Sequence, residues 1–128
     1  MALRRILLVE DEPDIRQIVR LSLETVGGFA VKACGSGEQA VQCGAGFHPD
    51  LILLDFMLPG MDGPATLQAL RLQETLAHTP AVFMTARACA RDRDSYRAMG
   101  AVDVIQKPFD PLALADTVQD IWRHHCTD

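Results

Sequence analysis

The chain contains 128 residues, a length that suits one domain with one hydrophobic core. Apolar residues make up 48% and charged residues 23%, the balance of a globular domain, and the net charge of −5 argues against non-specific nucleic-acid binding, which needs a basic surface. The longest apolar runs, at 51–58 and 6–9, are too short to cross a bilayer, and the start "MALRRILLVEDE" lacks the long apolar region of a secretory signal. We therefore expect a cytoplasmic protein that does not bind membranes.

Five short apolar runs have the length and composition of β-strands. In chain order they are "RILLVE" (5–10), "FAVKAC" (29–34), "DLILLDF" (50–56), "AVFMTA" (81–86) and "VDVIQ" (102–106). Residues 6–9 and 51–54 are apolar without alternation, which fits central strands of a parallel sheet covered on both faces.

Helical spacing of apolar residues appears between these runs. The first helix is expected over 15–26 with Gly27-Gly28 as its stop, the second begins after the capping residue Ser36, and the third covers about 63–76. The residues expected to face the core are Ile15, Ile18, Val19, Ser22, Leu23 and Val26 in the first helix, Ala40 and Val41 in the second, and Leu67 and Leu70 in the third.

The last two helices differ in character. The fourth, over about 88–99, is highly charged and has Tyr96 and Met99 as its main anchors, so we expect it to be loosely held or covered by another molecule. In the fifth, Asp110 is the expected cap and Pro111 the first helical residue, while "HHCTD" at the end reads as a polar tail. Its inner stripe is expected to consist of Leu114, Val118, Ile121 and Trp122.

Five strands alternating with five helices predict an α/β fold, in which right-handed crossovers place helices on both faces of a parallel sheet. The pattern does not fix the order of the strands. In open sheets of this class, binding sites form beyond the carboxyl ends of the strands. Those ends carry Glu10 and Asp11 after the first strand, Asp55 after the third, Thr85 and Ala86 after the fourth, and Lys107 after the fifth.

Glu10, Asp11 and Asp55 converge if the first and third strands are neighbours. Carboxylates held close together repel one another, and a hard divalent cation relieves that repulsion. No Cys or His lies near them in the sequence, so an oxygen-only ligand set favours Mg²⁺ over zinc. With the ammonium of Lys107 and the hydroxyl of Thr85 added, these residues suit a phosphoryl group carried on Asp55.

The cysteines, at 34, 43, 89 and 126, have neither CxxC spacing nor a His at a zinc-site interval. We interpret them as structural thiols of a protein in a reducing compartment. The histidines, at 48, 78, 124 and 125, are equally scattered, and we assign none of them a role.

The motifs "ILLVEDEPDIR", "DLILLDFMLPGMDG", "FMTA" and "GAVDVIQKPF" resemble, together and at their intervals, the receiver domain of bacterial two-component response regulators. The resemblance covers essentially the whole chain, so we expect one receiver domain over 1–128. It implies a doubly wound, CheY-like (flavodoxin-like) (βα)5 fold with a five-stranded parallel sheet in the order 2-1-3-4-5. It also implies that Asp55 accepts a phosphoryl group from a sensor histidine kinase or a histidine phosphotransfer protein.

The resemblance also implies roles for individual residues. Asp11, Asp55 and the backbone carbonyl of Met57 would bind Mg²⁺, or Mn²⁺ in its place, and Glu10 would orient a metal-bound water or reach the metal. Phosphoryl oxygens would be bound by Thr85, Ala86 and Lys107, with the Lys107–Pro108 peptide bond in the cis form. Met57 and Arg87 flank the path of attacking water and would tune the lifetime of the phosphoryl group.

One position departs from the family pattern. In receiver domains a Thr or Ser at the end of the fourth strand, here Thr85, is coupled to an aromatic residue in the fifth strand. That aromatic is expected three residues before Lys107, where this chain has Val104, which has no ring to rotate. We therefore expect the signal to leave by another route, such as repositioning of the polar segment 88–99.

Two other functions compete with a phosphorylatable switch. The Val104 departure motivates a pseudo-receiver, which would bind a partner protein without using phosphate. A phosphohydrolase with Asp55 as nucleophile is disfavoured, because dehalogenase-type phosphatases carry DxDx(T/V) after the first strand and "DFMLP" here lies on the third without a second Asp. We expect no enzyme activity in the ordinary sense.

The expected partners are proteins. They are the phosphodonor and a downstream protein bound through the face formed by the fourth helix, the fifth strand and the fifth helix, with no direct binding of nucleic acid. We expect a monomer or a weak dimer. Because the chain ends just past the fifth helix, we favour a single-domain regulator over a fragment of a longer protein.

Overall fold

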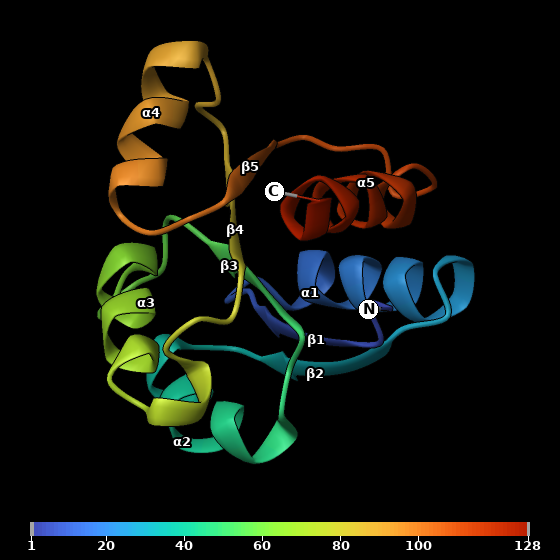
Figure 1. The fold of residues 1–128 in the computed structure, drawn as a ribbon. Helices are drawn as coiled ribbons and strands as arrows, with labels where there is room; N and C mark the ends of the chain where they lie inside the picture. The colour runs from blue at the N-terminus through green and yellow to red at the C-terminus, as the bar shows by residue number, and fades with distance from the viewer. Residues whose placement is uncertain (1, 128) are drawn as a thin grey trace.

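The computed structural model describes residues 2–127 and shows a five-stranded parallel sheet between two layers of helices (Figure 1). The strands are β1 (Arg5–Val9), β2 (Ala30–Cys34), β3 (Leu51–Asp55), β4 (Ala81–Thr85) and β5 (Asp103–Gln106). Their order is β2-β1-β3-β4-β5, the doubly wound topology expected from the sequence. Each strand lies within one residue of its predicted bounds at either end.

Helices connect the strands. They are α1 (Pro13–Leu21), α2 (Gly37–Phe47), α3 (Gly63–Arg71), α4 (Ala90–Ala98) and α5 (Leu114–Thr127), with a π-helical turn at Ser22–Val26 and a 3₁₀ turn at Glu74–Leu76. Ser36 caps α2 as predicted, because its hydroxyl accepts the amide hydrogen of Gln39. Within residues 2–127, no helix combines the length and the apolar character needed to cross a bilayer.

The sheet separates two hydrophobic clusters, because successive side chains of a strand point to opposite faces. One cluster packs α1 and α5 against the sheet and includes Ile6, Leu8, Val19, Val118 and Trp122. The other packs α2, α3 and α4 against the opposite face and includes Leu7, Val9, Leu67, Phe83 and Tyr96. Both layers are visible in Figure 1, where α1 and α5 lie together on one side of the sheet.

The first helix differs from its prediction in two ways. It begins at Pro13, and its last turn is π-helical rather than α-helical. The side chains of Ile18 and Val26, predicted to face the core, are 46% and 53% exposed. A π turn holds more residues than an α turn, so it rotates Val26 out of the apolar stripe, while Ile18 faces the segment that precedes α5 instead of the sheet.

Three further predictions about helices are wrong. The third helix ends at Arg71 rather than near residue 76, because a 3₁₀ turn follows it. Pro111 is not helical: the amide of Leu112 donates to Asp110 Oδ1 in a turn, and α5 starts only at Leu114. The residues read as a polar tail continue α5 to Thr127. Once a helix is formed and packed, each added residue gains an intrahelical hydrogen bond, so polar residues at its end can remain helical.

Candidate functional site

The carboxyl ends of β1 and β3 bring three carboxylates together. The two strands are neighbours, with Val9 paired with Leu54, so the residues that follow them emerge side by side. One carboxylate oxygen from each of Glu10, Asp11 and Asp55 lies within 4.8 Å of the others. Glu10 and Asp55 are 1% and 4% exposed, and Asp11 is half-buried. The convergence predicted from the sequence is therefore present.

Lys107 is the cation of this crevice. The peptide bond between Lys107 and Pro108 is cis, as expected from the sequence. The ammonium of Lys107 lies 3.2 Å from Glu10 Oε2 and 3.2 Å from Asp55 Oδ2. Burial lowers the pKa of Lys107, but the two carboxylates outweigh that effect and leave the pKa above its ordinary value.

The positive charge of Lys107 does not neutralise the negative charge of the three carboxylates in the crevice. Burial, with a hydrogen bond and charge repulsion from Asp55, raises the pKa of Glu10 from 4.5 to about 7 despite the opposing effect of Lys107. The folded chain therefore holds a carboxylate whose ionised form is unfavourable near neutral pH.

The donor set fits a hard divalent cation. All three groups are carboxylates, they approach one another to within 4.8 Å, and Asp11 leaves one side open to solvent. Mg²⁺ is commonly held by one or two carboxylates and several waters. Within residues 2–127, Glu10, Asp11 and Asp55 thus form a group that could hold a metal ion.

Thr85, at the end of β4, takes part in a hydrogen-bond network. Its Oγ1 accepts the amide hydrogen of Arg87 at 3.2 Å, and it lies 3.3 Å from the hydroxyl oxygen of Tyr96. The Tyr96 hydroxyl donates to the carbonyl oxygen of Arg87 at 2.9 Å. The hydroxyl of Thr85 is therefore engaged with the β4–α4 loop and with α4.

The rim of the crevice is formed by exposed side chains. Met57 is 74% exposed, and its amide donates to Asp55 Oδ1 at 3.2 Å. Ala86 and Arg87 are also exposed, and the guanidinium of Arg87 lies 3.9 Å from Asp92. Met57 thus lies directly beside Asp55, and Ala86 and Arg87 follow Thr85 on the exposed surface.

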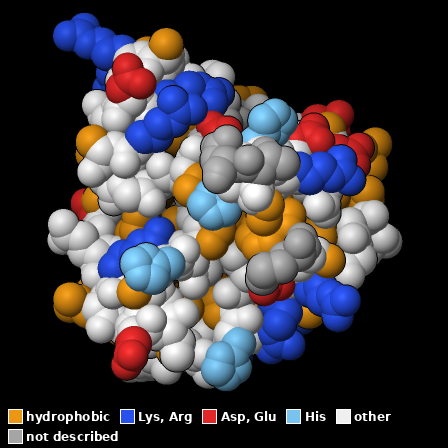
Figure 2. Space-filling model, viewed as in Figure 1, with side chains coloured by type: hydrophobic (Ala, Val, Ile, Leu, Met, Phe, Trp, Pro, Cys, Tyr) orange, Lys and Arg blue, Asp and Glu red, His pale blue; other side chains and the backbone are white. Residues whose placement is uncertain are grey.

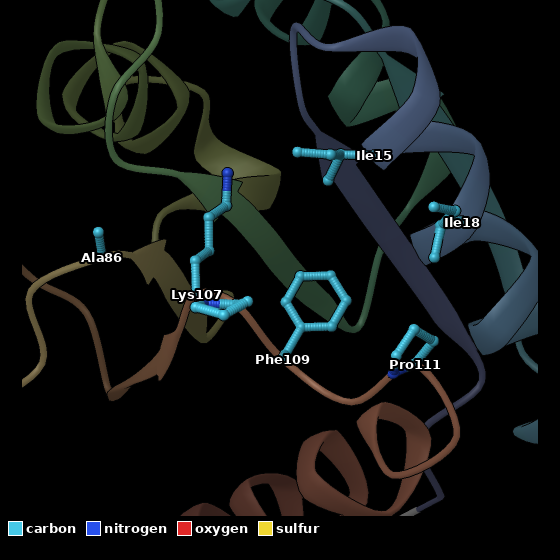
Figure 3. A pocket seen from close by; sticks show the side chains of 7 residues that line it. Ile15, Ile18, Ala86, Lys107, Phe109 and Pro111 are labelled. Carbon is cyan, nitrogen blue, oxygen red and sulfur yellow. The ribbon is translucent and has the colours of Figure 1, made fainter.

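An apolar pocket of about 380 Å³ borders the crevice on the side of α1. Figure 3 shows Phe109 and Pro111 facing Ile15 and Ile18 across it, with Lys107 at its edge. The pocket joins the charged crevice to an apolar surface, a combination that suits a protein partner.

Two residues of the site were missed or undervalued in the sequence. Arg16 of α1 donates to the backbone carbonyl of Glu10 at 3.0 Å and of Asp11 at 3.4 Å, and so holds the loop that carries both carboxylates. Tyr96 was expected to be only an apolar anchor, paired with Met99. Met99 is 42% exposed, and Tyr96 bonds to the β4–α4 loop through the Arg87 carbonyl. No spacing in the sequence indicates either contact.

The chain is similar to known proteins in sequence and in structure. Residues 6–119 match the response regulator receiver domain family. The chain is 40% identical to the transcriptional activator protein PfeR of Pseudomonas aeruginosa over 105 residues, covering 82% of this chain and 33% of that protein. It is 39% identical over 120 residues to the phosphate regulon regulatory protein PhoB of Escherichia coli, covering 94% of this chain and 52% of that protein. The chain thus spans about half or less of these relatives.

Solved structures of receiver-type proteins are similar to this chain in fold. The chemotaxis protein CheY4 of Vibrio cholerae is 29% identical, with a TM-score of 0.85 over 94% of this chain and 99% of that chain. The receiver domain of a sensor histidine kinase from Pseudomonas aeruginosa is 33% identical, with a TM-score of 0.79 over 93% of this chain and 97% of that chain, and is described with a magnesium ion in its active-site cleft. Receiver domains are signalling modules that interact with histidine kinases. With its fold, its acidic crevice and the family match, this chain belongs to the response regulator receiver domains of two-component systems.

Proposed function

We propose that this chain is a phosphorylatable switch in which Asp55 accepts a phosphoryl group from a phosphohistidine in a Mg²⁺-dependent reaction. The observation that carries the proposal is the joint placement of Asp55 with two further carboxylates and Lys107 in one crevice. An oxygen of Asp55 forms the new bond to phosphorus while the bond between phosphorus and the donor's imidazole nitrogen breaks. The nitrogen keeps the electron pair and takes a proton, so the donor leaves as an ordinary histidine.

Each neighbouring residue has a proposed task in this transfer. Glu10, Asp11, Asp55 and the carbonyl of Met57 would hold the metal, which supplies charge neutralisation to the phosphoryl oxygens. Lys107, already 3.2 Å from Asp55, would move to a phosphoryl oxygen, and Thr85 with the backbone at Ala86 would bind others. Met57 and Arg87 at the rim would set how readily water hydrolyses the acyl phosphate.

The direct test uses a small phosphodonor such as acetyl phosphate with Mg²⁺, and intact-mass measurement. Wild type should gain one phosphoryl group, Asp55→Asn none, and the control Asp14→Asn, which alters an exposed carboxylate of α1, as much as wild type. Asp11→Asn should slow the reaction because it removes a metal ligand but leaves the acceptor. Wild type that stays unmodified at saturating Mg²⁺ and donor would refute the proposal.

We further propose that the phosphohistidine protein docks on the apolar pocket beside Lys107. A donor histidine that reaches Asp55 must contact the surface around the crevice, and the pocket with the exposed Ile18 is an apolar part of that surface. Ile18→Asp should lower the rate with a kinase or phosphotransfer donor and leave the rate with acetyl phosphate unchanged. If Ile18→Asp and wild type accept the phosphoryl group from the protein donor at equal rates, this assignment is contradicted.

A second candidate function is favoured by one observation. Val104 stands where receiver domains carry the strand-five aromatic, which fits a pseudo-receiver that binds a partner independently of phosphate. Beryllofluoride, a phosphoryl mimic, separates the two. Partner affinity that changes with the mimic supports the switch, and affinity that stays constant supports the pseudo-receiver.

The remaining assignments belong to the same proposal. The domain would extend over 1–128, act in the cytoplasm as a monomer or weak dimer, and signal to a protein through α4, β5 and α5 without binding nucleic acid itself. Figure 2 shows charged side chains over α4, which carries Arg91, Asp92, Arg93, Asp94 and Arg97 and suits a polar protein interface. Analytical ultracentrifugation with and without beryllofluoride tests the oligomeric state.

A further inference from the structure

Tyr96 has an unusual position on an otherwise polar helix. It is 6% exposed and is the buried residue of α4, whose other residues are mostly charged. Its ring packs against Phe56 and Phe83, with centroid distances of 4.9 and 5.8 Å. The attachment of α4 to the apolar core of this face therefore depends on one side chain.

The hydrogen bonds around Tyr96 form a closed ring. Arg87 donates its amide hydrogen to Thr85 Oγ1, and Tyr96 donates its hydroxyl hydrogen to the Arg87 carbonyl. Each hydroxyl carries one hydrogen, so the 3.3 Å contact between Thr85 and Tyr96 must be a bond donated by Thr85. In this state the single hydroxyl hydrogen of Thr85 is committed to Tyr96.

A phosphoryl group on Asp55 competes for that hydrogen. Phosphoryl oxygens are acceptors only, so Thr85 can bind one only by donating, and it then cannot donate to Tyr96. The Tyr96 oxygen, buried beside the loop, then loses the hydrogen bond that it accepts and keeps only the one that it donates to the Arg87 carbonyl. Occupation of the phosphoryl site is thereby coupled to the position of Tyr96.

The surroundings of Tyr96 allow that coupling. Val104 of β5 lies in the same apolar cluster as Tyr96, is paired with Phe83 and is smaller than an aromatic residue. Tyr96 also lines a hollow of about 500 Å³, together with residues that include Phe56, Thr85 and Arg87. The ring therefore has room to leave its present position toward the β4–α4 loop.

We propose that Tyr96 of α4 is the aromatic reporter of the phosphoryl site, in place of an aromatic on β5. Transfer of the Thr85 hydrogen bond from Tyr96 to the phosphoryl group releases Tyr96 and repositions α4. This inference rests on the proposed function, because it needs a phosphoryl group at Asp55. Tyr96 acts through Thr85 and is a positioning residue.

Tyr96 is the one tyrosine of the sequence, which makes the experiment selective. Protein labelled with 3-fluorotyrosine gives a single protein fluorine resonance, and beryllofluoride bound at the phosphoryl site is followed through its own fluorine signals. Saturation with Mg²⁺ and beryllofluoride should shift the Tyr96 resonance. The shift should be absent in Thr85→Val at full occupancy of the mimic, because that variant has no hydroxyl hydrogen to transfer.

The variant Tyr96→Phe supplies a test of sign. It keeps the ring and removes the oxygen that competes for the Thr85 hydrogen, so the mimic should bind about two- to tenfold more tightly, the effect of one hydrogen bond. Loss of a merely structural contact would weaken binding instead. Trp122→Phe, an aromatic replacement on the opposite face of the sheet, should leave the affinity unchanged. Thermal unfolding monitored by circular dichroism checks that each variant is folded.

The results separate this inference from the proposed function. A Tyr96 resonance that stays in place while the mimic saturates the site overturns the inference and leaves the phosphorylatable switch intact. Equal or weaker binding by Tyr96→Phe also overturns it. Failure of wild type to bind the mimic at all overturns the proposed function, and this inference with it.

Discussion

Replacing Glu10 by Gln should stabilise the metal-free protein. The pKa of Glu10 is raised from 4.5 to about 7, so keeping it ionised in the folded chain costs about 3 kcal/mol. That cost already includes the attraction of Lys107, 3.2 Å away, which retains Asp55 as a partner after the substitution. The expected gain is therefore up to about 3 kcal/mol at pH 8, or up to about 10 °C in Tm.

The sign of the pH dependence follows from the same pKa. A carboxyl with a folded-state pKa above its unfolded value favours folding only while it is protonated, and that contribution is lost as the pH rises from 4.5 through about 7. The stability difference between Glu10→Gln and wild type should therefore be small at pH 4.5 and largest above pH 7.

Thermal unfolding in chelator at pH 8 measures the effect, with Glu12→Gln as the matched control. Glu12 is exposed in the same loop and lies outside the carboxylate cluster, so its Tm should match wild type. Saturating Mg²⁺ should narrow or reverse the gap, because wild type keeps all three carboxylates for the cation. The reasoning is refuted if Glu10→Gln melts below wild type in chelator, or no higher than Glu12→Gln.

Three further predictions concern packing and thiols. Gly63→Ala places a Cβ 2.7 Å from the backbone oxygen of Asp55, so it should lower the free energy of unfolding by about 1–3 kcal/mol and weaken Mg²⁺ binding. The control Gly46→Ala, whose added Cβ has nothing within 4 Å, should do neither. Thermal unfolding and Mg²⁺ titration compare the two variants. Trp122→Ala should cost about 3–5 kcal/mol in denaturant unfolding while phosphoryl-mimic affinity is kept, because its cavity opens in the α1–α5 cluster. Burial raises the pKa of Cys34 from 9.0 to about 12, so alkylation of the native protein at pH 8 should spare Cys34 and modify the exposed Cys89. The contribution of Cys34 to stability should fall as the pH rises above 9. Reaction of Cys34 as fast as Cys89 would contradict this reasoning.

The strands and the site were predictable because both depend on local signals. Residues 51–54 are fully buried, as their unbroken apolar run predicts. Asp55 ends that run at the carboxyl edge of the sheet, where binding sites form in folds of this class. The same rule placed Glu10, Thr85 and Lys107, since each directly follows or closes an apolar run. Chemistry that lies at strand ends can be predicted from sequence once the strands are known.

The failures arise where tertiary contacts override local pattern. Ile18 has helical spacing with Ile15 and Ser22, yet it faces the pocket near Phe109, and nothing local distinguishes that side of α1 from the sheet side. The π turn at Ser22 is accompanied by a hydrogen bond from the Ser22 hydroxyl to the Pro111 carbonyl, a contact between residues far apart in sequence. The hydrogen bond of Tyr96 to the β4–α4 loop likewise depends on how α4 packs against the sheet, which the spacing of residues in the sequence does not indicate.

The two outermost strands of the sheet are short. β2 has five residues with Lys32 at its centre, and β5 has four and begins with Asp103, whose carboxylate pairs with Arg93 of α4. Short, charged strands are poor templates for strand addition by a second chain. A movement of α4 away from β5 would therefore uncover little backbone that another molecule could pair with. Such a protein can change the cover of its sheet repeatedly while its resistance to aggregation is retained.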